Sequence, residues 1–226
     1  NKINNIDYYY SSIEYIDEKN IKKFLKEANK IIDTHLNNLE FNLTQIYRRY
    51  KTVLNCGRHM KVFNKYDAIP EYCFSCFKVQ IEPENIVDLL KLYIVFDKIN
   101  FPNNNLRKCM IELRSNVQGK YKALVYCNSI EESENILNHL TKIIDKNFNK
   151  TLVSKIKKGC SEYGMKYPKY DNLTDNAMIY NPEWKKYENL IDAKNPDLAF
   201  EKKTRPTIKG ISLYDVLVIR NWLTYA

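Results

Sequence analysis

The sequence predicts an α+β fold in which a ferredoxin-like βαββαβ core, at about residues 72–160, is flanked by helical segments. Hydrophobic patterns of period two and period 3.6 alternate through this stretch in the order strand, helix, strand, strand, helix, strand. Hydrophobic residues make up 44% of the chain and charged residues 28%, which is ordinary globular usage. Only 5 of the 226 residues are glycine and none are clustered, which excludes Gly-rich phosphate-binding loops.

The N-terminal part, residues 1–70, is expected to be a helical segment and its connection to the core. From Asp17 to about Tyr50, apolar side chains recur every three or four residues, as on the buried face of an amphipathic helix. We expect one long helix there, or two helices in line. The apolar stripe is wide and its flanking charges are irregular, so packing on the same chain is favoured over the alternative, self-association as a coiled coil.

The first half of the core, which spans residues 71–160 as a whole, is predicted to be a strand followed by a helix. Residues 77–81 alternate between apolar and polar side chains, which indicates a strand. Pro83 and Glu84 then begin a helix, since proline fits the first turn. Its apolar side runs to Phe96.

The second half is predicted to be a hairpin, a helix and a last strand. Residues 109–114 and 121–127 alternate on either side of a short connection that contains glycine, as in a β-hairpin. Ser129 and Glu132 have the spacing of a capping box at a helix start. A strand at 152–158 completes an antiparallel sheet with helices on one face.

The C-terminal part, residues 161–226, is expected to be a loop-rich extension that packs with the other parts as one domain. Four prolines punctuate it, with a short helix predicted over Glu183 to Asp192 and a closing helix from Ile211 to Ala226. No apolar run is long enough to cross a bilayer, so no membrane partner is expected. Six cysteines are too few for a disulfide scaffold in a chain of this length, which favours the cytoplasm.

Two short pairs of metal-ligating residues form the most specific motif. Cys56 and His59, then Cys73 and Cys76, give the spacing C-x2-H-x13-C-x2-C. Three thiolates and one imidazole suit a tetrahedral, structural zinc ion. The alternatives are buried thiols that act as small hydrophobic side chains, and a redox pair or iron–sulfur ligation.

The net charge of +9 is spread along the chain and marks no basic segment by itself. Strand alternation, however, predicts a basic and partly aromatic face on the side of the sheet away from the helices. Its candidate nucleic-acid-binding residues are Lys78, Arg114, Lys122, Tyr126, Lys155 and Lys157. The predicted topology is that of RNA-recognition modules, which bind RNA on such a face, so RNA or DNA binding is the leading function. The alternative is that a terminal helix covers this face.

Two other function classes stay open. Cys160 follows a basic strand end and lies beside Gly159, so an enzyme could use this thiol and the loop from Gly159 to Tyr170. Histidine is scarce, and no neighbouring base is evident in the sequence. A protein-interaction module that uses the two terminal helices is the third alternative.

Overall fold

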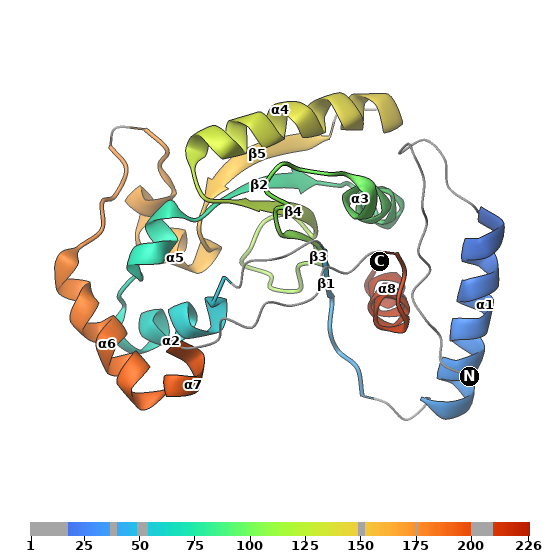
Figure 1. Cartoon of the computed structure of the whole chain (residues 1–226), viewed down its shortest axis with the longest axis horizontal. Helices are drawn as coiled ribbons and strands as arrows, with labels where there is room; N and C mark the ends of the chain where they lie inside the picture. The colour runs from blue at the N-terminus through green and yellow to red at the C-terminus, as the bar shows by residue number, and fades with distance from the viewer. Residues whose placement is uncertain (1–17, 37–39, 49–53, 149–151, 175, 200–209) are drawn as a thin grey trace.

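The computed structural model describes residues 18–36, 40–48, 54–148, 152–174, 176–199 and 210–226 (Figure 1). Five antiparallel strands form one sheet in the order β1-β3-β4-β2-β5. They are β1 (Gln45–Arg48), β2 (Phe77–Glu82), β3 (Arg107–Ile111), β4 (Tyr121–Cys127) and β5 (Val153–Lys158). The predicted α+β class is confirmed.

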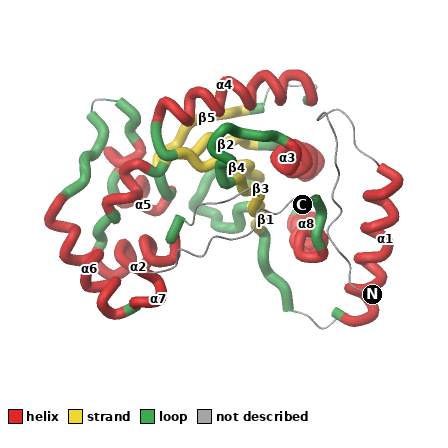
Figure 2. Tube along the Cα trace, in the orientation of Figure 1, coloured by secondary structure: helices red, strands yellow, loops and turns green. Residues whose placement is uncertain are grey.

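Eight α-helices surround this sheet in the described part of the chain. They are α1 (Glu18–His35), α2 (Cys56–Tyr66), α3 (Ile86–Lys98), α4 (Ile130–Asn147), α5 (Ser161–Lys166), α6 (Lys185–Lys194), α7 (Pro196–Ala199) and α8 (Leu213–Tyr225). Figure 2 shows the strands in the middle, with α3, α4 and α8 toward one side and α2, α5 and α6 toward the other. The helices that pack on the sheet, α3, α4 and α8, share one core with it, in line with the predicted sheet that has helices on one face.

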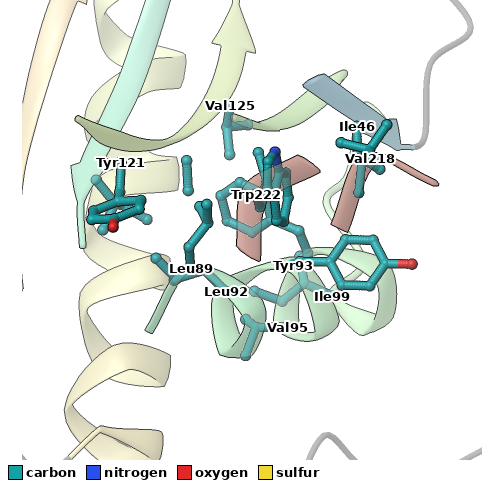
Figure 3. Packing of buried hydrophobic residues seen from close by; sticks show 14 of the residues in the cluster. Ile46, Leu89, Leu92, Tyr93, Val95, Ile99, Tyr121, Val125, Val218 and Trp222 are labelled. Carbon is teal, nitrogen blue, oxygen red and sulfur yellow. The ribbon is translucent and has the colours of Figure 1, made fainter. Parts of the chain in front are cut away.

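The main core lies between the sheet and helices α3, α4 and α8 (Figure 3). Val79 on β2 pairs with Val125 on β4, and both side chains are buried in this core. Trp222 of α8 is also fully buried, where its ring meets Tyr93 of α3 edge-on at 6.5 Å. Its indole donates a hydrogen bond to the carbonyl of Thr44 at 2.8 Å, as a buried indole requires.

The predicted long N-terminal helix is correct only in its first half. The helix α1 ends at His35, and residues 45–48 form the edge strand β1, whose Ile46 pairs with Cys109. A short apolar run fits both a strand and a helix, and here the contact with β3 decides. Tyr50 lies outside the described residues. Phe24 and Ala28 of α1 are buried in the main core, so packing on the same chain is confirmed.

The other predicted elements are found with shifted bounds. The hairpin strand β3 ends at Ile111 and not at residue 114 as predicted, and Leu113 is exposed. Ser129 caps α4 as predicted and accepts a hydrogen bond from the Glu132 amide at 3.1 Å. The carboxylate of Glu132 reaches the amide of Asn128 instead of closing the box on Ser129.

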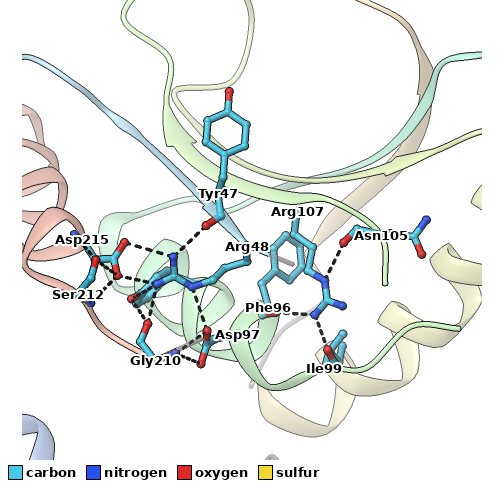
Figure 4. Close-up of polar contacts among 11 residues, drawn as sticks. Tyr47, Arg48, Phe96, Asp97, Ile99, Asn105, Arg107, Gly210, Ser212 and Asp215 are labelled. Atoms are coloured by element: carbon cyan, nitrogen blue, oxygen red, sulfur yellow. Dashed lines mark hydrogen bonds and ion pairs between the residues drawn. The ribbon is translucent and has the colours of Figure 1, made fainter. Parts of the chain in front are cut away.

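A buried arginine fastens the C-terminal helix to the sheet (Figure 4). Arg48 of β1 is 2% exposed and binds Asp97 of α3 at 2.9 Å and Asp215 of α8 at 2.8 Å. The same guanidinium donates to the carbonyl of Gly210 at 2.8 Å. These bonds join three segments that are far apart in the sequence, and they fix the position of the edge strand β1.

A smaller apolar cluster joins the 56–76 region to the segment after β5. Its buried members are Phe63, Ile69, Cys73, Tyr163 and Tyr170. Gly159 has a φ of +49°, and a Cβ there would lie 1.8 Å from the Tyr170 hydroxyl. Only glycine fits this close approach, so Gly159 serves local packing between β5 and η2 (Pro168–Asp171).

Candidate nucleic-acid interface

Side chains of the sheet that point away from α3 and α4 form what we call the polar face. Because Val79 and Val125 enter the main core, their strand neighbours Lys78 and Tyr126 lie on the opposite side. The register aligns Lys157, Lys78 and Tyr126 in one cross-strand row. The members of the polar face used below are Tyr47, Lys78, Gln80, Lys108, Lys122, Tyr126, Lys155 and Lys157.

Two predicted lysines on this face are neutralised by neighbouring carboxylates. Lys155 pairs with Glu82 at 2.5 Å, and Lys122 pairs with Glu112 at 3.3 Å. Lys122 is itself buried, so its charge is satisfied inside the protein. Neither lysine offers a free cation to a ligand.

The predicted Arg114 does not lie on a strand. It follows the end of β3, where its guanidinium binds Glu112 at 2.8 Å and also contacts Glu162 of α5. Hydrogen bonds from Arg114 are the largest reason that the pKa of Glu112 falls to about 2. Arg114 therefore stabilises the β3–β4 connection, and its charge is already balanced.

Three lysines of the polar face form no ion pair with a carboxylate among the described residues, although the charge of Asp171 interacts with two of them, Lys78 and Lys157. We call Lys78, Lys108 and Lys157 the lysine cluster. Lys78 lies at its centre and is 8% exposed. The ammonium of Lys108 lies over the rings of Tyr47 at 5.6 Å and Tyr126 at 6.0 Å. Cation–π contacts of this kind hold the ammonium without neutralising its charge.

The pKa shifts show that these lysines affect one another. Burial, and then the charge of Lys78, lowers the pKa of Lys108 to about 8. The same two causes lower the pKa of Lys157, against the opposing charge of Asp171. A set of like charges that is partly removed from water is stabilised by an anion placed between them. The arrangement can therefore bind a phosphate or another compact anionic group.

Three thiols border the lysine cluster. The charge of Lys78 favours the thiolates of Cys56, Cys76 and Cys160, but burial is the larger effect and raises all three pKa values. The pKa of Cys56 rises to about 11 and that of Cys76 to about 12. Protonated thiols are poor nucleophiles, so this environment does not favour Cys160 as the reactive group of an enzyme.

The predicted zinc ligands come from α2 (Cys56 and His59) and from the η1 turn, Glu71–Ser75, with the residue that follows it (Cys73 and Cys76). Cys73 is buried and donates to the hydroxyl of Tyr163 at 3.6 Å. Among the residues that the structure describes, no three His, Cys, Asp or Glu side chains are arranged to hold a metal ion. The zinc site rests on the sequence spacing alone.

His59 makes contacts with Arg58 of α2 and with Tyr72 of η1. Its ring stacks on Tyr72 at 5.4 Å, and its Nδ1 lies 3.2 Å from the guanidinium of Arg58. Burial, and then Arg58, lowers the pKa of His59 to about 4. Arg58 in turn binds Asp192 of α6 at 2.6 Å, so this part of α2 fastens α6 to the rest of the chain.

Sequence reasoning missed two residues of the polar face, Lys108 and Tyr47. Tyr47 was assigned to a helix, and the hairpin strand was predicted to begin one residue after Lys108. Extending the alternation of Cys109 and Met110 backward by one residue would have placed Lys108 on the same face as Lys78.

Comparison with known proteins adds no further assignment. No family model, no curated protein and no solved structure matches this chain. Within the described segments, no helix has the length and apolar character needed to cross a membrane. The function must therefore be inferred from the site.

Proposed function

We propose that this protein is a non-enzymatic binding module for single-stranded RNA or DNA, with the lysine cluster as the site that holds phosphate. The observation that carries the proposal is the set of three lysines on one sheet face that form no ion pair in the described structure. Burial of a charged side chain costs desolvation energy, and Lys78, at 8% exposure, has no described ion pair, although it interacts with the charge of Asp171. A bound phosphate would offset that cost.

The recessed position of Lys78 determines how a strand would bind. Gln80 and Lys122, its neighbours on the polar face, are also buried, so an extended strand cannot lie flat across the centre of the sheet. A phosphate directed inward can reach the cluster, and Tyr126 pairs with Lys78 across β4 and β2. The pKa of Tyr126 is raised well above its usual range by burial, so this hydroxyl stays a hydrogen-bond donor.

The architecture supports the proposal in a second way. We infer that β2-α3-β3-β4-α4-β5 forms a ferredoxin-like unit, to which β1 adds an edge strand beside β3. A sheet face opposite the two helices is where modules of this topology bind RNA, although fold likeness alone does not establish function. We also propose a cytoplasmic location, because six cysteines are too few for a disulfide scaffold in a chain of this length.

The test is fluorescence anisotropy of a labelled oligouridine and the matching oligodeoxythymidine, titrated with the full chain at low salt. The triple variant K78Q/K108Q/K157Q is expected to bind at least about tenfold more weakly than the unmodified chain, since several phosphate contacts are lost together. The matched control K26Q/K30Q/K142Q removes the same three charges from exposed sites on α1 and α4. It is expected to change affinity by less than about threefold.

Two results would contradict the proposal. One is the absence of binding to either oligonucleotide at low salt. The other is equal loss of affinity in the two triple variants, which would show that only net charge matters. Circular dichroism of each variant establishes that it is folded before its affinity is compared.

A further inference from the structure

The N-terminus of α2 is open to an anion. No side chain caps this helix, and its first turn holds no acidic residue. The His59 amide donates to the carbonyl of Asn55 at 3.1 Å, but the amides of Gly57 and Arg58 before it have no acceptor among the described residues. A Cβ at Gly57 would meet nothing within 4 Å, so these amides can be approached from outside. Together with the helix dipole, such free amides attract negative charge.

Two observations place this end of α2 beside the lysine cluster. The ring of His59 stacks on Tyr72 of η1 at 5.4 Å, and the chain leads from η1 directly into β2, which carries Lys78. The charges of Lys108 and Lys78 also act on the thiol of Cys56, the first residue of α2, where they oppose the rise of its pKa. The positive end of the helix therefore adds to the charge of two ammonium groups.

Lys78 is buried, yet a small anion can reach it. The residue is 8% exposed and forms no hydrogen bond or ion pair with any described residue. Its ammonium is nevertheless not one of the fully enclosed polar atoms that lack a hydrogen-bond partner in the described part of the chain. The ammonium thus keeps contact with solvent. Lys108 and Lys157, on either side of it, are half-buried.

Two carboxylates act on the lysine cluster and show which part of it is most positive. The charge of Asp171 acts on Lys157 and Lys78. The charge of Glu112 acts on Lys108, but two other cations already bind this carboxylate. The space next to Lys78, Lys108 and α2 therefore favours an anion more than the space next to Lys157 does.

The recess suits the end of a nucleic-acid chain better than its middle. Lys78 and its neighbours Gln80 and Lys122 are all buried, so a group must point inward to reach the ammonium. An internal phosphodiester carries the chain on both sides and has a single negative charge. A terminal phosphate has one ester bond, three free oxygens and a charge of about −1.5 to −2 at pH 7. Its oxygens can be shared between ammonium groups and helix amides.

We propose that the lysine cluster and the N-terminus of α2 together bind a terminal phosphate monoester, so that the protein recognises a phosphorylated end of single-stranded RNA or DNA. This inference rests on the proposed function, because the lysines are the same. It adds the amides of α2 to the site, and it predicts a preference that binding to the chain alone does not require.

Competition against a labelled oligouridine tests the preference with the full chain at low salt. The unlabelled competitors carry a 5′-phosphate, a 3′-phosphate or hydroxyls at both ends. One phosphorylated form is expected to bind at least about tenfold more tightly than the hydroxyl form, and the two arms identify which end is recognised. A hydroxyl-ended oligouridine two residues longer carries about the same added charge, and it should stay within about twofold of the shorter one.

A pair of variants at one position tests the role of α2. Gly57→Asp places a carboxylate in the first turn, where it favours the helix but repels a phosphate, and Gly57→Asn adds a side chain of similar size without the charge. The Asp variant is expected to reduce the preference for the phosphorylated end to less than about threefold. The Asn variant should keep the preference within about twofold of that of the unmodified chain.

The outcomes separate this inference from the proposed function. Equal affinity for phosphorylated and hydroxyl-ended oligouridines, or equal effects of the two Gly57 variants, would overturn the inference and leave nucleic-acid binding in place. Absence of binding to every oligouridine would overturn both.

Discussion

Replacing Arg48 with methionine is the most informative perturbation of the fold. The substitution keeps an unbranched chain of similar length but removes the guanidinium that binds Asp97 and Asp215. It also removes the hydrogen bonds to the Tyr93 hydroxyl at 2.5 Å and to the carbonyl of Gly210 at 2.8 Å. Both carboxylates are buried, so water cannot replace the lost partner.

The expected loss of stability depends on which hydrogen bonds the carboxylates of Asp97 and Asp215 keep. Removing one partner of a buried ion pair costs about 3–5 kcal/mol, because an uncompensated charge is left behind. Asp97 keeps the Gly210 amide, whose single N–H is shared between its two oxygens, and Asp215 keeps the hydrogen bonds from the Ser212 amide and hydroxyl. We therefore expect Arg48→Met to lower the free energy of unfolding by about 4 kcal/mol rather than by twice that amount.

The assay is urea unfolding followed by circular dichroism and by tryptophan fluorescence, since Trp222 is buried beside the network. The matched control is Arg220→Met, which breaks the exposed pair with Asp33 at 2.8 Å and should cost less than about 1 kcal/mol. A loss for Arg48→Met that is no larger than the loss for Arg220→Met would refute the reasoning, because burial would then not decide the cost.

Three further predictions test other parts of the structure. Gly159→Ala should lower the free energy of unfolding by about 2–3 kcal/mol, because the new Cβ would overlap the Tyr170 hydroxyl. Gly57→Ala, which has open space around it, should be neutral or slightly stabilising, and urea titrations compare the two variants. The pKa of Glu112 is lowered to about 2, so its stabilising contribution is complete above about pH 5 and is lost as the pH falls toward 2. In Glu112→Gln the melting temperature should therefore depend less on pH between 5 and 2 than in the unmodified chain. The same dependence of melting temperature on pH in both proteins would contradict this. Because the pKa of Lys108 is lowered to about 8, the affinity for oligonucleotides should fall as the pH rises from 7 to 9. Lys108→Arg stays charged over this range and should remove most of that fall. Identical pH profiles of affinity in the two proteins would count against a role for this side chain.

Local patterns predicted those elements whose hydrophobic period is long or repeated. Residues 77–81 alternate and form β2, and the periodic segment after Ser129 forms α4 with the predicted cap. The four residues of β1 are too few to show a period, and their state is set by pairing with β3, which is far away in the sequence.

In the candidate site, too, local patterns predicted some features, and contacts between distant segments decided the others. Alternation along β2 and β5 placed Lys78 and Lys157 on one face, as the register shows. It did not predict that Lys122 is buried against Glu112, or that Arg114 binds Glu162 across the fold. Charge balance depends on contacts between distant segments, so the sequence predicted the face but not which of its cations stay unpaired.

The zinc prediction has its own direct check. Protein purified without added metal should contain about one zinc ion per chain if the C-x2-H-x13-C-x2-C spacing forms a structural site. A ratio near zero would leave Cys73 and His59 as the buried, hydrogen-bonded side chains that the structure describes.

The salt dependence of oligouridine binding tests the central claim most directly. If Lys78, Lys108 and Lys157 hold phosphates, the slope of log K against log salt concentration should be less steep in K78Q/K108Q/K157Q by about 2, since each contact with a single strand contributes about 0.7. The exposed-lysine control K26Q/K30Q/K142Q should keep the slope of the unmodified chain. A slope that is the same in both triple variants would contradict phosphate binding by the lysine cluster.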